Sequence, residues 1–172
     1  MIKDFNELKL KIDKCIVAAL ERTRREVGGV LLEKTMDYYD EYDPVQYTRE
    51  KETTFTLLDS LASESKYSLD KGKVTKTNDG YEFKVGWDDT YLNFHYKQAT
   101  GRMVLEWFDD KSHGGWLYDN NGDRFEHKFF TEAIEELGGE KGIENLFKQN
   151  CKKVGLCSRF NGRVITKPWF QS

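Results

Sequence analysis

The fold of this chain is decided first by residues 4–29, DFNELKLKIDKCIVAALERTRREVGG. Residues at steps of three and four form one face of an amphipathic helix, namely Phe5, Leu8, Ile12, Ile16, Ala19, Leu20 and Thr23. Asp4 is a candidate N-cap, and Glu7 three residues later completes the pattern of a capping box. The sequence therefore predicts a helix from the first residues onward.

Helical character resumes after the pair Gly28-Gly29 and extends from Val30 to Tyr42. Each glycine weakens a helix by about 1 kcal/mol relative to alanine, so the pattern leaves open one kinked helix or two helices. Pro44 ends this stretch because the residue before a proline is disfavoured in the α region. A short apolar cluster at 55–61 predicts a further turn of helix, which completes a helical part over 4–62.

The hydrophobic period changes from helical to two after residue 65. Tyr81, Phe83, Val85 and Trp87 alternate with polar or small residues, as in a half-buried strand. The turn signal Asn78-Asp79-Gly80 makes 73–77 its hairpin partner. Similar alternation at 92–96 and 103–107 predicts an antiparallel meander of about four strands over 65–110, although 92–96 also fits a short helix.

The C-terminal part returns to helices after a loop at 111–128. Helical spacing covers 129–137, where Gly138-Gly139 ends the helix, and a second helix follows around 143–154. Residues 163–170 predict a final strand with Pro168 near its end. Because no strand–helix–strand rhythm is present, we expect an α+β fold in a single domain over 1–172.

Composition excludes several classes of protein. The chain has 172 residues, of which 4 are Trp, 9 Tyr and 11 Phe, so it can fill a core and is not a disordered chain. A net charge of -3 disfavours nucleic-acid binding by a wholly basic surface. No apolar run is long enough to span a bilayer. The three cysteines and the absence of a signal pattern at the N-terminus predict reduced thiols and cytosolic synthesis.

Catalytic and metal-binding patterns are weak. The three cysteines and three histidines lack the short paired spacing of zinc sites. The run 119–123, DNNGD, begins like a calcium loop, but Arg124 and Phe130 stand where an EF-hand needs glycine and glutamate. The pairs Asp88-Asp89 and Asp109-Asp110 are candidate catalytic carboxylates, for which solvated turns are the commoner explanation. We therefore expect no metal, no cofactor and no enzyme activity.

Two surface features remain candidates for contacts with a partner. Lys9, Lys11, Lys14, Arg22, Arg24 and Arg25 make the polar face of the first helix positive, which indicates either a solvated face or a contact with acidic proteins or passing DNA. Tyr38, Tyr39, Tyr42 and Tyr47 gather around Pro44. Tyrosine is enriched at interfaces, but these residues can equally pack a helix onto the sheet.

The run 38–49, YYDEYDPVQYTR, followed by LLDSL at 57–61 and by His113-Gly114-Gly115, resembles a known family. It is similar to small neck or tail-completion proteins of tailed phages and prophages of Gram-positive bacteria. The similarity covers the first 61 residues and the loop at 113–115. The chain departs from the family pattern at 50–55, where extra residues separate the tyrosine- and proline-containing run at 38–49 from the leucines at 57–61.

This resemblance implies a structural component of the virion neck, which joins the head connector to the tail by forming a ring. Such a ring subunit needs two complementary, heterologous surfaces rather than a pocket. The implied partners are further copies of the chain, portal and tail proteins, and DNA passing through the lumen without specific binding, with no membrane. The implied interface residues are Tyr38, Tyr42, Tyr47, Arg49, His113, Gly114 and Gly115. The alternative is a soluble protein-binding module of the adaptor or immunity type.

Overall fold

The computed structural model describes residues 4–41, 57–88 and 129–156 of the chain. Its elements, in chain order, are the helix α1 (Phe5–Glu41), the short helix α2 (Leu57–Asp59), the wide π-type turn η1 (Ser60–Glu64), the strands β1 (Thr75–Lys76) and β2 (Tyr81–Glu82), and the helices α4 (Phe129–Glu136) and α5 (Gly139–Lys153). The described part of the molecule is therefore mostly helical.

Residues Phe5–Glu41 form one continuous helix, α1, of 37 residues and about 55 Å. The predicted cap is confirmed, because the backbone N–H of Glu7 donates to Asp4 Oδ1 at 2.8 Å. The glycine pair does not break the helix. Gly28 is buried, and a Cβ there would collide with Leu69 and would lie 2.8 Å from Val85 Cγ2. Glycine at this position lets the second segment pack directly against the helix backbone.

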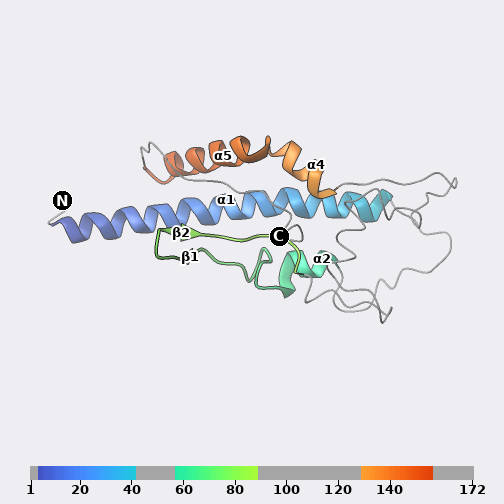
Figure 1. Cartoon of the computed structure of the whole chain (residues 1–172), viewed down its shortest axis with the longest axis horizontal. Helices are drawn as coiled ribbons and strands as arrows, with labels where there is room; N and C mark the ends of the chain where they lie inside the picture. The colour runs from blue at the N-terminus through green and yellow to red at the C-terminus, as the bar shows by residue number, and fades with distance from the viewer. Residues whose placement is uncertain (1–3, 42–56, 89–128, 157–172) are drawn as a thin grey trace.

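Helix α1 lies between two layers that differ in their structure. Helices α4 and α5 run along one side of it, and α2, η1 and the β1–β2 hairpin lie on the other side (Figure 1). The N-terminal turns of α1 extend past both layers, as Figure 1 also shows. The other described elements therefore all pack around the single helix α1.

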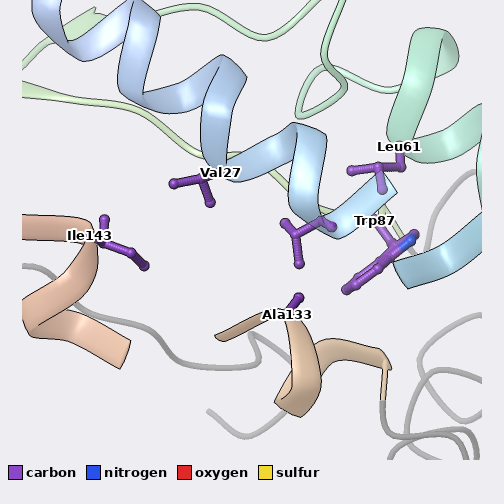
Figure 2. Packing of buried hydrophobic residues seen from close by; sticks show 6 residues of the cluster. Val27, Leu61, Trp87, Ala133 and Ile143 are labelled. Carbon is purple, nitrogen blue, oxygen red and sulfur yellow. The ribbon is translucent and has the colours of Figure 1, made fainter. Parts of the chain in front are cut away.

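The main core lies where the segments 57–88 and 129–156 meet α1. Val27 and Leu31 of α1 pack with Leu61, Trp87, Ala133 and Ile143, all buried (Figure 2). The Trp87 and Phe130 rings meet edge to face, with centroids 6.1 Å apart. A second buried cluster joins Ala19 to Phe147 and Cys151 of α5. The core therefore depends on contacts between residues more than 25 positions apart.

The prediction of a four-stranded meander, and with it the α+β class, is wrong for the described residues. Only the hairpin is present, with Thr75 opposite Glu82 and Lys76 opposite Tyr81. After β2 the chain stays extended but leaves the ladder: Gly86 N–H donates to Tyr67 O at 3.2 Å. Val85 and Trp87 pack on α1 instead. The period of two reflects an extended segment on a helix, which alternates its side chains as a strand does.

The C-terminal helices are confirmed. Helix α4 ends at a left-handed glycine, Gly138, with φ of 76°, and α5 begins directly after it, earlier than the apolar spacing indicated. The predicted strands at 92–96, 103–107 and 163–170 lie outside the described residues, as does the whole of the predicted loop at 111–128.

Candidate protein interface

The structure describes little of the predicted interface. Tyr38 lies in the last turn of α1, and its side chain is outside the described part. The other predicted residues, Tyr42, Tyr47, Arg49, His113, Gly114 and Gly115, all lie outside the described residues. These assignments stay predictions, and the candidate surfaces below come from α1.

One residue of the predicted basic face has a different role. Arg24 was expected on the polar surface of the helix, but its side chain is only 2% exposed. Its Nε donates to Glu21 Oε2 at 3.0 Å, and its two terminal nitrogens donate to the backbone oxygens of Ser68 and Leu69 at 3.0 and 3.1 Å. Arg24 therefore ties α1 to the segment after η1 rather than meeting a partner.

Glu21 and Gly72 both contribute to the site that holds the Arg24 guanidinium. Glu21 Oε1 accepts the backbone N–H of Val74 at 2.8 Å, so the carboxylate bridges Arg24 and the approach to the hairpin. A Cβ at Gly72 would lie 2.9 Å from Arg24 Nη1 and 2.6 Å from Ser68 O. A residue with a side chain at that position would displace the segment, so the Glu21–Arg24 pair and Gly72 act together as a structural anchor.

A second polar anchor joins α1 to α5. Asn150 is fully buried, and its Nδ2 donates to Thr23 Oγ1 at 3.2 Å and to Glu26 Oε2 at 2.8 Å. Lys153 Nζ, one helical turn after Asn150, lies 3.6 Å from Glu26 Oε1. A buried amide that meets two specific acceptors favours one register of α5 on α1, because a slip leaves polar groups unpaired.

The attachment of α4 to α1 includes an ion pair at the surface. Lys34 Nζ lies 3.0 Å from Glu136 Oε2 and 3.5 Å from Asp37 Oδ2. The hydrogen bond with Glu136 raises the pKa of Lys34 above its usual value, with a smaller contribution from Asp37. Lys34 therefore stays protonated at neutral pH.

The N-terminal turns of α1 expose large apolar side chains. Phe5 is 78% exposed, Leu10 60%, Ile12 39% and Leu8 37%. Phe5, Leu8 and Ile12 continue the face that, further along the helix, packs Ala19 against α5. The sequence pattern predicted this face correctly but not its exposure. The face stays exposed because α5, the helix that covers its continuation, has 15 residues, whereas α1 has 37.

A second open surface, here called the α1 back face, runs along the side of α1 away from both layers. It consists of Arg22, Arg25, Gly29, Glu33 and Met36, all exposed, with Met36 49% exposed. The side chains of Arg22, Arg25 and Glu33 form no hydrogen bond or ion pair in the described part of the chain. The back face thus has charges of both signs that the described fold does not use.

The described residues contain little that indicates catalysis. Asp88 is buried, and its backbone N–H donates to Ser60 Oγ at 2.7 Å, so this half of the Asp88-Asp89 pair belongs to the core. Cys15 and Cys151 are free thiols. Within 4–41, 57–88 and 129–156, no three His, Cys, Asp or Glu side chains are grouped to hold a metal ion. In the same ranges, no helix has the length and apolarity to cross a membrane.

Comparisons with family models, with characterised proteins and with solved structures give no match for this chain.

Proposed function

We propose that this chain is an assembly protein that acts by docking, as a structural component of a tailed-phage neck that joins the head connector to the tail. The observation that carries the docking role is the exposed apolar end of α1. Phe5, Leu8 and Ile12 lie on one face of the turns that no other described element covers. Apolar side chains concentrated at one exposed site are typical of contacts with another protein.

The physical case rests on the cost of leaving this end uncovered. Burying a leucine or isoleucine side chain contributes about 1.5–3 kcal/mol, and α1 extends this face without a partner in the described chain. A ring subunit supplies such a partner, because its neighbour covers the surface that the fold leaves open. The assignment to the phage neck comes from the resemblance of residues 38–61 and 113–115, and it stays a proposal.

The test uses two α1 variants that are matched in chemistry. Leu8→Gln/Ile12→Gln removes the apolar character of the exposed face, whereas Leu10→Gln changes a leucine about 160° away from Leu8 around the helix. The mass of each protein in solution is measured by light scattering over a concentration series, alone and with purified portal and tail proteins of a tailed phage. The thermal unfolding of each variant is recorded as a control for the monomer fold.

We expect the wild type to form a ring-sized species, by itself or on the connector. We expect Leu8→Gln/Ile12→Gln to lose this species while its melting temperature stays within a few degrees of the wild type. Leu10→Gln should assemble normally. A wild type that binds neither itself nor the connector, or assembly that survives the double substitution, contradicts the proposal. A monomer that binds one unrelated protein at 1:1 supports the binding-module alternative instead.

A further inference from the structure

The α1 back face has a symmetry in its sequence that the described fold does not require. Its residues stand at positions 22, 25, 29, 33 and 36, which are spaced evenly on both sides of Gly29. Arg25 and Glu33 lie one helical turn before and after this glycine, on one i, i+4 row. Arg22 and Met36 lie two turns before and after it. A basic half is therefore followed by an acidic and apolar half on a single exposed face.

Gly29 itself has no packing reason inside the described chain. A Cβ at this position would meet no atom within 4 Å, in contrast to the neighbouring Gly28, where it would collide with Leu69. An exposed glycine in the middle of a helix costs about 1 kcal/mol relative to alanine. Glycine at the centre of a helix face does bring one benefit, which is the close approach of another backbone.

We infer that the α1 back face binds a second copy of this chain, with the two α1 helices antiparallel and crossing at Gly29. A two-fold axis at Gly29 places each residue i opposite residue 58 − i of the second copy. Arg25 then faces Glu33 of the other copy, and Glu33 faces its Arg25, so the axis forms two ion pairs. The same axis places Arg22 beside Met36, where the aliphatic stem of arginine covers an apolar side chain.

Charge complementarity selects this occupant and orientation. A parallel pair in the same register would set Arg25 against Arg25 and Glu33 against Glu33, which is repulsive. A polyanion such as DNA would be repelled by Glu33 in the C-terminal half of this face. A complementary partner surface is acidic opposite Arg25 and basic opposite Glu33. The back face of a second copy of this chain, in the antiparallel orientation, has this arrangement of charges. The contact pairs a surface with itself, so it does not rest on the ring proposed above, which uses heterologous surfaces.

The experiment exploits the two-fold symmetry through charge reversal. Arg25→Glu and Glu33→Arg each place like charges opposite one another twice in a symmetric pair. When the two variants are mixed, both contacts join opposite charges again. Sedimentation equilibrium is measured for the chain with the wild-type back face, for each variant alone, and for the equimolar mixture, and all of these proteins carry Leu8→Gln/Ile12→Gln so that ring formation does not contribute to the mass. Lys9→Glu provides the matched control, because it makes the same charge change on an exposed α1 position outside the back face.

We expect the chain with the wild-type back face to associate from 20.2 kDa to twice that mass, weakly, since a contact of this size is at the small end of specific interfaces. Each single variant should associate at least about tenfold more weakly, and the mixture should recover the wild-type affinity as a heterodimer. Gly29→Gln, which adds a side chain at the crossing, should abolish the dimer and leave the monomer folded. Lys9→Glu should dimerise as the wild type does.

Three results overturn the inference. They are a chain with the wild-type back face that stays a monomer up to millimolar concentration, single variants that associate as tightly as that chain, or a mixture that recovers nothing. None of these readouts depends on the connector or on Leu8 and Ile12, so the dimer and the neck role can fail separately.

Discussion

Replacing Arg24 by methionine tests the main anchor between α1 and the second segment. Methionine keeps much of the volume of the side chain but removes the charge-assisted hydrogen bonds to Glu21, Ser68 and Leu69. Ser68 O keeps a bond from the backbone of Gly72 at 2.9 Å, and Glu21 is 31% exposed, so the loss is partly compensated. Breaking a buried charged network costs about 3–5 kcal/mol, and we expect the lower end, about 3 kcal/mol.

Urea unfolding followed by far-UV circular dichroism measures this loss directly. With an m-value of about 2 kcal/mol per molar urea, Arg24→Met should lower the unfolding midpoint by about 1.5 M. The matched control is Arg25→Met, one residue further along the same helix. Because Arg25 is exposed, its loss should change stability by no more than about 0.5 kcal/mol, when measured at low protein concentration. Equal midpoints for the two variants would show that Arg24 is not buried as described and would refute the reasoning.

Three further predictions concern the packing around α1. Gly28→Ala should destabilise the fold, whereas Gly29→Ala should stabilise the monomer by up to about 1 kcal/mol; thermal melts that shift in the same direction would contradict the packing described for this pair. Asn150→Ala should cost about 2 kcal/mol, because two acceptors on α1 lose their donor, and an unchanged urea midpoint would refute the buried network. The raised pKa of Lys34 means that its pair with Glu136 stabilises the folded state fully below the ordinary lysine pKa of 10.5 and loses this effect as the pH rises through the higher folded value. From neutral pH upward, the difference in unfolding free energy between the wild type and Lys34→Met should therefore stay constant at first and shrink above that pH, and a difference that is constant into strong alkali would count against the pair.

Local patterns predicted the helices of this chain well. The Asp4 cap, the helical spacing from Phe5 and the end of α4 before Gly138 all depend on neighbouring residues, and the structure confirms them. The sheet was predicted wrongly because alternation shows only that a segment is extended and half buried. It does not show whether the backbone of Tyr81 to Trp87 pairs with strands or, as here, leaves the ladder and lies on a helix.

The candidate surfaces were predicted less well, for a related reason. Local sequence does not distinguish Arg24 from its exposed neighbour Arg25. Arg24 is buried because it contacts Ser68 and Leu69, which lie more than 40 residues away in the sequence. The apolar end of α1 was predicted as one face of an amphipathic helix, and the sequence contains no measure of how far α5 extends along that face.

The sequence by itself determined that the stretches on either side of Gly28-Gly29 are helical, that 129–137 and the segment after it form two more helices, and that a tight turn lies at 78–80. These follow from dihedral preferences, capping and hydrophobic period, which act over a few residues. Only the tertiary structure decided that Gly28-Gly29 stays helical, that Arg24 is an anchor, and which faces of α1 remain open. Such outcomes depend on packing between distant segments, whose free energies outweigh the roughly 1 kcal/mol preferences of single residues.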